Sequence, residues 1–171
     1  METGILGFIG SKNIGDYIQT KAVIDLVGSR NIKILDRENL DNYNDNVIKT
    51  IINGWFMESP ENWPPSEKIK PLFISFHLNP SIQVELLKDR SLKYFKRHEP
   101  IGCRDTYTRD ILLKKGINAF YSSCITTTID RNNYLKSKTQ SEGIIVIGAF
   151  DRLKPTLDYK SSFKLLLSIL K

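Results

Sequence analysis

Several polar and aromatic groups in this sequence stand directly after apolar runs, at points where the chain leaves a buried segment. The informative ones are NIGD at 13–16, NGWF at 53–56, His77, GCRD at 102–105 and YSSCITTT at 121–128. In open α/β sheets, ligands bind in the crevice outside the carboxyl ends of the strands. These groups are therefore the candidates for binding and chemistry.

The NIGD group combines several roles within one turn. Gly15 allows close approach of the backbone, and Asp16 can cap the helix that follows. Asn13 belongs to the same turn, and exposed amides at the start of that helix can hold an anion. Capping and ligand binding are both open for Asp16.

In the NGWF group, Asn53 and Gly54 are sufficient to make a turn at the end of a strand. Trp55 differs from them, because a tryptophan just beyond a strand end can offer a flat apolar surface to a sugar ring. A second tryptophan, Trp63, lies in the proline-rich loop that follows. Packing beneath that loop is the alternative for these rings.

His77 follows the apolar run PLFISF. Histidine is the side chain most readily poised for proton transfer near neutral pH, and a strand end is the right place for that role. A structural, hydrogen-bonded role is the alternative. His98 stands among Lys96, Arg97 and Glu99, so we expect it on a solvated surface.

Arg104 precedes a helix that either Asp105 or Thr106 can cap. Its guanidinium would lie near the positive end of that helix, where it meets either a carboxylate or phosphate of a ligand or a nearby acidic side chain. Both interpretations are open. Ser123 lies in a hydroxyl-rich loop, and such a loop can cradle the oxygens of a phosphate or a sugar.

The elements that must position these groups alternate between strand-length apolar runs and helical stretches. Expected strands cover residues 5–9, 31–36, 47–54, 71–78, 101–105, 117–121 and 142–150; expected helices cover 17–27, 81–89, 106–116 and 159–170, and a polar linker covers 130–142. This alternation predicts an α/β fold with a layered, Rossmann-like, mostly parallel sheet and flanking helices. We expect a single domain over 1–171, with its motif-bearing part at about 5–129 and a last strand and helix at 143–171.

The chain has 171 residues, of which 40% are hydrophobic and 26% charged. These values are typical of one globular domain and exclude a disordered or fibrous chain. The longest apolar runs are far shorter than a membrane span. The first residues fit neither a charged leader nor a cleavable signal, so we expect cytoplasmic residence.

The net charge of +6 is spread along the chain, with its densest local group at 88–97. Anionic ligands are therefore plausible, whereas nucleic acid is only weakly indicated. Cys103 and Cys124 lack the spacing of a metal site, and both are expected to be thiols. The sequence has no GxSxG, HExxH or Walker loop, so it does not support a hydrolase, metalloprotease or nucleoside triphosphatase.

Five stretches together resemble the polysaccharide pyruvyl transferase family in wording, order and spacing. They are NIGD, INGWFM, the stretch from NWPPS to PLFISFHL, PIGCRDTYTRDILLKKGI, and YSSCITTT. The resemblance implies transfer of an enolpyruvyl unit from phosphoenolpyruvate to a sugar hydroxyl, usually closing to a pyruvate ketal on a glycan or glycan precursor. No cofactor is implied beyond this donor substrate. The implied fold is one half of a two-domain glycosyltransferase-B type.

Site roles follow from the resemblance by motif position. It implies catalytic roles for His77, Arg104 and Asp16, substrate-binding roles for Asn13, Gly15, Asn53, Trp55 and Ser123, and no metal. In this hypothesis Arg104 binds the charge of the donor, His77 moves protons and Trp55 faces the sugar.

Members of this family are generally much longer than this chain. We therefore expect the half-site that supplies further basic groups for phosphoenolpyruvate to be missing, with a homo-oligomer or a second-domain partner as its source. The alternative function is a non-catalytic module that retains half of the enzyme fold and binds a glycan or a partner protein.

Overall fold

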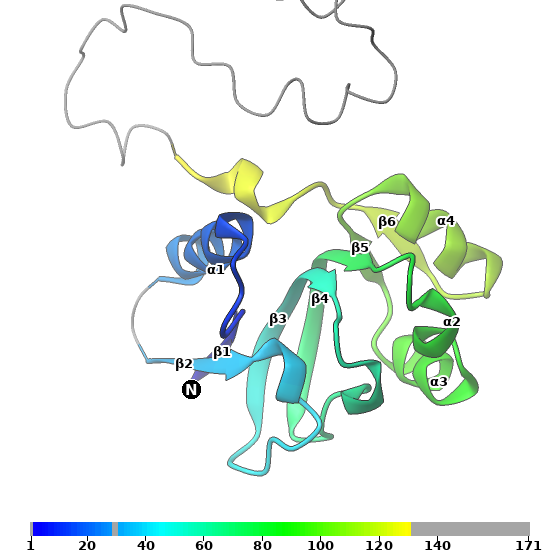
Figure 1. Cartoon of the computed structure of the whole chain (residues 1–171), viewed down its shortest axis with the longest axis horizontal. Helices are drawn as coiled ribbons and strands as arrows, with labels where there is room; N and C mark the ends of the chain where they lie inside the picture. Colours follow the sequence, from blue (N-terminus) through cyan, green and yellow to red (C-terminus); the bar gives the residue numbers. More distant parts are fainter. Residues whose placement is uncertain (1, 29–30, 131–171) are drawn as a thin grey trace, which may run out of the picture. The chain divides into compact units, whose positions relative to one another are not determined.

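The structure of the chain is a computed structural model that describes residues 2–28 and 31–130 (Figure 1). The described residues form a six-stranded, all-parallel sheet in the order β2-β1-β3-β4-β5-β6. This arrangement confirms the predicted α/β, Rossmann-like class. The strand and helix expected at 143–171, and all but the first residue of the expected linker, lie outside the described residues.

The elements alternate along the chain much as the apolar runs predict. They are β1 (Thr3–Gly7), α1 (Ile14–Val27), β2 (Ile32–Asp36), β3 (Ile48–Phe56), β4 (Ile69–Leu78), α2 (Gln83–Leu86), α3 (Asp89–Arg97), β5 (Ile101–Cys103), α4 (Thr106–Lys114) and β6 (Ala119–Tyr121). Short 3₁₀ turns occupy Arg37–Asn39, Pro60–Asn62 and Ile125–Thr128. None of these helices combines the length and apolar character needed to cross a membrane.

Helix α1 begins at Ile14, three residues earlier than expected. Asn13 is its N-cap, because the Asn13 Oδ1 accepts a hydrogen bond from the Gly15 amide at 3.0 Å. Asparagine is among the best residues for this position. The expectation that Asp16 caps this helix is therefore wrong, since Asp16 lies inside its first turn.

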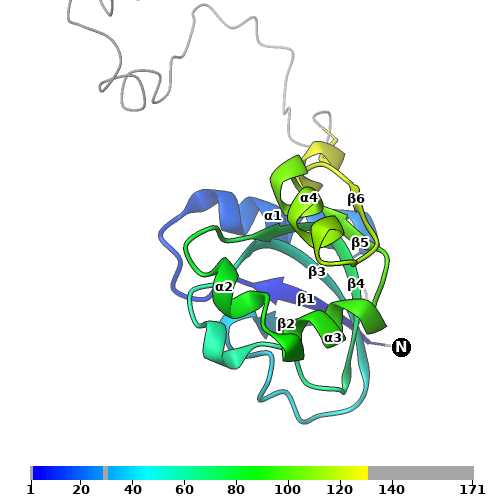
Figure 2. The ribbon, with the colours of Figure 1, turned by 90° about the vertical axis from the view of Figure 1, so that its right-hand side faces the viewer.

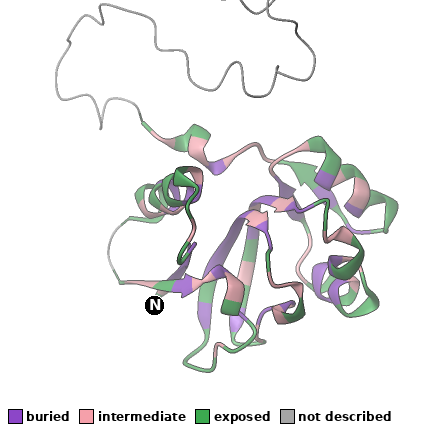
Figure 3. Ribbon diagram, in the orientation of Figure 1, coloured by how far each residue is buried: buried purple, intermediate pink, exposed green. Residues whose placement is uncertain are grey.

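The sheet packs on both of its faces (Figures 1 and 2). Neighbouring residues of a strand point to opposite faces, so Ile5 and Ile51 join a small cluster with Ala22 and Val23 of α1. Leu6 of β1 and Ile52 of β3 face the other way, where α2, α3 and α4 lie. Burial is concentrated in the strands between these layers (Figure 3).

The larger cluster contains six mutually packed rings, which we call the aromatic core: Phe56, Trp63, Phe73, Phe76, Tyr94 and Phe95. Trp63 is at its centre, with ring centroids 5.4–6.4 Å from those of the other five. Its side chain is only 2% exposed. Packing is therefore the role of Trp63, and a sugar-facing surface at this ring is excluded.

Helix α3 was not predicted, because most of its residues are charged and read as a basic group. Only Ser91, Tyr94 and Phe95 are buried along it. His98 follows the helix and packs its ring 4.6 Å from that of Tyr94. The expected solvated position of His98 is wrong, since the side chain is half-buried and this burial lowers its pKa.

Candidate functional site

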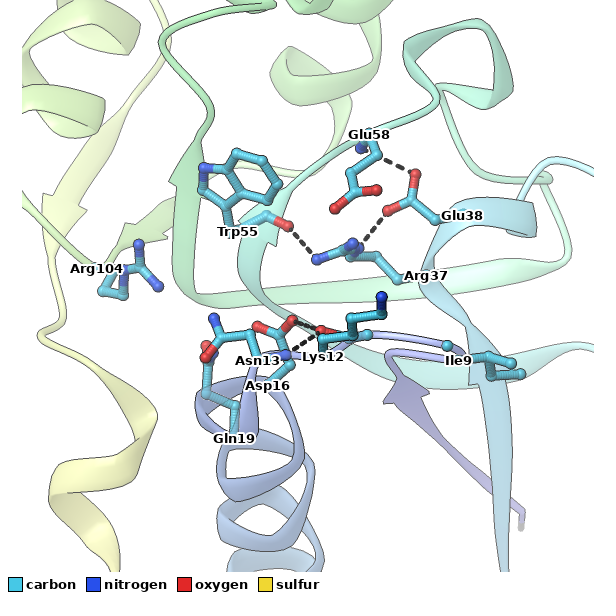
Figure 4. Close-up of a pocket in the computed structure, with 12 residues that line it drawn as sticks. Ile9, Lys12, Asn13, Asp16, Gln19, Arg37, Glu38, Trp55, Glu58 and Arg104 are labelled. Atoms are coloured by element: carbon cyan, nitrogen blue, oxygen red, sulfur yellow. Dashed lines mark hydrogen bonds and ion pairs between the residues drawn. The ribbon is translucent and has the colours of Figure 1, made fainter.

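A cleft of about 640 Å³ opens at the carboxyl edge of the sheet, as expected for parallel strands (Figure 4). We call it the carboxyl-edge cleft. It is framed by the loops after β1, β2, β3 and β5 and by the start of α1. Its lining residues are Ile9, Gly10, Ser11, Lys12, Asn13, Asp16, Gln19, Arg37, Glu38, Trp55, Glu58 and Arg104.

The cleft brings together four of the residues singled out from the sequence. Asn13, Asp16, Trp55 and Arg104 all line it, although they come from three separate segments. Gly15 lies beside Asn13 in the first turn of α1 but is not part of the lining. Asn53, His77 and Ser123 lie outside the lining as well.

The start of α1 forms one wall of the cleft. Asp16 is 7% exposed, and its carboxylate accepts a hydrogen bond from the Ser11 hydroxyl at 2.5 Å. The amides of Gly15 and Asp16 donate to the Oδ1 and the carbonyl oxygen of Asn13. These two amides are therefore occupied, which corrects the expectation that they are exposed for an anion.

Arg37 forms part of the opposite wall and was missed in the sequence. It is 4% exposed, donates from Nη1 to the Trp55 carbonyl oxygen at 2.9 Å and forms an ion pair with Glu38. Its guanidinium also lies 4.8 Å from the Phe8 ring centroid, a cation–π distance. Its position in the sequence could have identified it as a candidate, because Arg37 follows β2 directly, just as Arg104 follows β5.

Glu38 fastens two of the loops that frame the cleft. Its Oε1 pairs with Arg37, while its Oε2 accepts hydrogen bonds from the amides of Glu58 and Ser59 at 3.0 and 2.7 Å. The Glu38 carbonyl oxygen accepts a further bond from Asn62. The loop after β2 thus holds the loop after β3 in place, and both carboxylate oxygens are used.

Arg104 stands at the end of β5, on the far side of the cleft from Ile9 (Figure 4). Its backbone amide donates to the Phe76 carbonyl oxygen at 2.8 Å, which fixes it beside β4. Among the residues that the structure describes, its guanidinium has no acidic partner. The ion-pair alternative for Arg104 is therefore not observed within this part of the chain.

His77 is held by Asp105 at the start of α4. The His77 Nδ1 contacts the Asp105 Oδ2, and Asp105 caps α4 by accepting from the Thr108 amide at 2.8 Å. Burial alone would raise the pKa of Asp105, but the hydrogen bonds from His77 and Thr108 outweigh it and lower that pKa. His77 is the register partner of Trp55 on β3, one strand away from the cleft lining.

Asn53 on β3 and Ser123 in the loop after β6 each lie at an irregular point of the backbone. Asn53 is 1% exposed, and its carboxamide has no partner among the described residues. It sits where the β3–β4 register shifts, between Ile52 and Gly54. Ser123 has a left-handed φ of 64° and accepts at its carbonyl oxygen from the Ser75 hydroxyl at 2.7 Å.

The cleft offers charges and hydrogen-bonding groups rather than a metal site. Across residues 2–28 and 31–130, no group of three histidine, cysteine or acidic side chains lies close enough to hold a metal ion. Cys103 and Cys124 are free, and burial raises the pKa of the Cys103 thiol to about 12. A free thiol with so high a pKa is a poor nucleophile at neutral pH.

The model of the polysaccharide pyruvyl transferase family matches residues 13–169. This match contains the stretch from NIGD to CITTT on which the sequence resemblance rests. No curated protein and no solved structure gives a significant match.

Proposed function

Since this chain belongs to the polysaccharide pyruvyl transferase family, we propose that it transfers a pyruvyl group from phosphoenolpyruvate to a sugar of a glycan or glycan precursor. Family membership gives a pyruvyl transferase-like function in general terms. The observation that carries the more specific proposal is the carboxyl-edge cleft. There the guanidinium of Arg104, which has no acidic partner among the described residues, and the half-buried ring of Trp55 share one space with the start of α1.

Arg104 is our proposed binder of the donor. Phosphoenolpyruvate carries a carboxylate and a phosphate, and a guanidinium offers a planar fork of donors that matches either group in a two-point contact. Of the three cations that line the cleft, Arg37 is paired with Glu38, whereas Lys12 and Arg104 have no acidic partner within the described ranges. The free positive charge for an anion therefore comes from these two.

The proposed transfer needs no covalent intermediate on the protein. A sugar hydroxyl oxygen bonds to C2 of phosphoenolpyruvate, the bond from C2 to the phosphate oxygen breaks, and a second hydroxyl oxygen closes the ketal at C2. One hydroxyl proton ends on the methylene carbon, which becomes a methyl group, and the other leaves with phosphate. Positive charge that develops at C2 is stabilised by groups already in position.

His77 is our proposed residue for moving one of these protons. The contact of its Nδ1 with Asp105 leaves Nε2 as the nitrogen that can take up and release a proton. Its register partner is Trp55, which faces the cleft and is the proposed surface for the sugar ring. Asp105 would then act as the positioning residue of His77.

The direct test is incubation of the full chain with phosphoenolpyruvate and a panel of nucleotide-linked and lipid-linked sugars. We expect phosphate release that depends on both the donor and one class of sugar. A mass increase on that sugar should match a pyruvate ketal. Absence of phosphate release with every sugar would contradict the proposal, and glycan binding without donor binding would instead fit a non-catalytic module.

A further inference from the structure

Gln19 is a buried residue of the cleft, and the proposed function assigns it no role. It lies on α1, lines the cleft and is only 5% exposed. Its Oε1 has no hydrogen-bond partner among the residues that the structure describes. A buried acceptor without a donor is unfavourable, so a ligand that donates to this atom would gain from it.

One hydrogen bond fixes which atom of the Gln19 carboxamide is left without a partner. The Gln19 Nε2 donates to the Gly15 carbonyl oxygen at 3.3 Å, which leaves Oε1 as the free acceptor. Gly54 makes room for it, because a Cβ at this left-handed glycine (φ 85°) would lie 3.0 Å from the Gln19 Oε1 and 2.9 Å from Phe8. The free oxygen is therefore held at one place beside the end of β3.

The neighbouring side chain on the same wall also accepts hydrogen bonds. Asp16 lies three residues before Gln19, so the two side chains share one face of α1, and both line the cleft. Figure 4 shows them on the side of the cleft formed by α1, whereas Arg104 stands on the strand side. The cleft thus separates these two acceptors of α1 from the guanidinium of Arg104, while Lys12, the second cation, stands in the loop just before α1.

The chemistry of the two substrates matches this division. Carboxylate and phosphate oxygens of phosphoenolpyruvate accept hydrogen bonds, whereas each sugar hydroxyl can donate one. An anion beside Asp16 and Gln19 would meet a like charge and a second acceptor. A sugar hydroxyl would instead supply the donor that the Gln19 Oε1 lacks.

We propose that the Gln19 Oε1 accepts a hydrogen bond from one hydroxyl of the acceptor sugar, so that Gln19 and Asp16 form the sugar-binding wall of the cleft. The inference rests on the proposed function only for the identity of the sugar as acceptor. It adds a specificity-determining residue to that function, and the location of the sugar on the α1 side.

The first test uses the unmodified full chain and calorimetric binding of methyl hexopyranosides and their single-deoxy derivatives. For the sugar that binds best, loss of one particular hydroxyl should weaken binding about tenfold, the scale of one hydrogen bond to a buried acceptor. The inference is overturned if no hexopyranoside binds, or if every single-deoxy derivative binds about as well as its parent.

The second test assigns that hydroxyl to Gln19. Gln19→Met should weaken binding of the parent sugar about tenfold but leave binding of the sensitive deoxy derivative unchanged. The reason is that the variant and the deoxy sugar each remove the same hydrogen bond. Gln19→Glu keeps an acceptor oxygen and should bind the parent sugar better than Gln19→Met. If Gln19→Met weakens binding of the parent sugar and of the deoxy derivative equally, Gln19 affects binding only through the structure of the protein, and the inference fails.

Thr50→Val is the matched control. Thr50 is 2% exposed, and its Oγ1 likewise has no partner in the described part of the chain, but it does not line the cleft. Removing this oxygen should leave sugar binding unchanged. An equal loss in Thr50→Val and Gln19→Met would also overturn the inference.

Phosphoenolpyruvate binding and phosphate release, measured on the same preparations, separate the two proposals. Absence of both, with the deoxy pattern intact, would refute the transfer and leave the sugar wall standing. Phosphate release with an unaltered sugar KM in Gln19→Met would refute the assignment of Gln19 alone.

Discussion

The aromatic core and the carboxyl-edge cleft use the same residue type in opposite ways. Trp63, at the centre of the core, is 2% exposed and packs against five rings. Trp55, eight positions earlier, is half-buried, lines the cleft and offers its carbonyl oxygen to Arg37. Position decides the difference, because Trp55 stands at the carboxyl end of β3, whereas Trp63 follows a 3₁₀ turn and lies in the core.

The two regions also differ in which polar groups lack a partner. Most atoms of the core are apolar, and its polar atoms without a partner among the described residues are the Trp63 indole Nε1 and the Tyr94 hydroxyl. In the cleft, and within the part of the chain that the structure describes, the buried Gln19 has an acceptor oxygen without a donor and Arg104 has no acidic partner. Unpaired polar groups lower stability, but in the core they accompany extensive apolar burial, whereas in the cleft they remain available for a ligand.

The largest effect should come from Trp63→Ala. Loss of a buried aromatic side chain leaves a cavity and costs about 3–5 kcal/mol of unfolding free energy, which urea denaturation would measure. Trp63→Phe should cost less, since it keeps a ring and the Trp63 Nε1 has no partner among the described residues. A loss below about 1 kcal/mol in Trp63→Ala would break the contrast between the two tryptophans.

Arg104→Ala should mainly affect the donor. Removing a charged hydrogen-bond donor should cost roughly 1.5–3 kcal/mol of phosphoenolpyruvate affinity, measured by calorimetry, with little change in melting temperature. Arg104→Lys should restore only part of the affinity, because lysine is a compact point charge. Arg109→Ala removes a neighbouring arginine that is paired with Asp110 outside the cleft lining, and should leave donor affinity unchanged. Unchanged affinity in a folded Arg104→Ala protein would remove Arg104 from the site.

Trp55→Ala should reduce the affinity for the sugar more than it reduces the stability of the fold. The ring should contribute about 1 kcal/mol to acceptor binding, the scale of an aromatic contact, and its carbonyl oxygen remains for Arg37. Trp55→Phe should retain most of the affinity. Binding titrations and thermal melts on the same variants separate the outcomes, since a drop of several degrees without a ligand effect would place Trp55 with the packing residues.

The smallest effect concerns Asp105, which joins β4 to α4 next to the cleft. Its pKa is lower in the folded protein, so its stabilising contribution is present above the unfolded pKa of about 4 and is lost as the pH falls through the folded value. Asparagine also caps helices well, so Asp105→Asn should cost less than about 1 kcal/mol at pH 7 because solvent screens this partly exposed group. Urea titrations should show that cost vanishing at low pH.

Asp110→Asn is the control for that titration. Asp110 is exposed and pairs with Arg109 on the same helix, without contact to His77. Its loss should change stability less than that of Asp105. A cost of Asp105→Asn that stays constant from pH 7 down to pH 3 would show that the charge of Asp105 is not what stabilises the fold.

Much of the fold could be predicted because local patterns report burial. The apolar runs at β1, β3 and β4 are strands as expected, although β1 ends at Gly7 and β3 extends to Phe56. Helix α3 was not predicted, since only Leu92, Tyr94 and Phe95 mark its apolar face among many charges. Its folding depends on the aromatic core, which forms between residues far apart in the sequence.

The candidate site was predictable where a single residue follows a strand. Asn13, Asp16, Trp55 and Arg104 converge because parallel strands end at one edge. The burial of Arg37 could not be foreseen, because a charged residue in a polar segment normally faces solvent. Its burial depends on the Phe8 ring and on Glu38, and on strand order that no local pattern specifies.

The Glu38 carboxylate also has a consequence for how this cleft can evolve. One oxygen compensates the buried guanidinium of Arg37 and the other holds the amides of Glu58 and Ser59. A substitution of Glu38 would release both at once, so we expect lineages to change the loops after β2 and β3 together. The loop that carries Arg104 is joined to neither by these bonds, and it is free to diverge on its own.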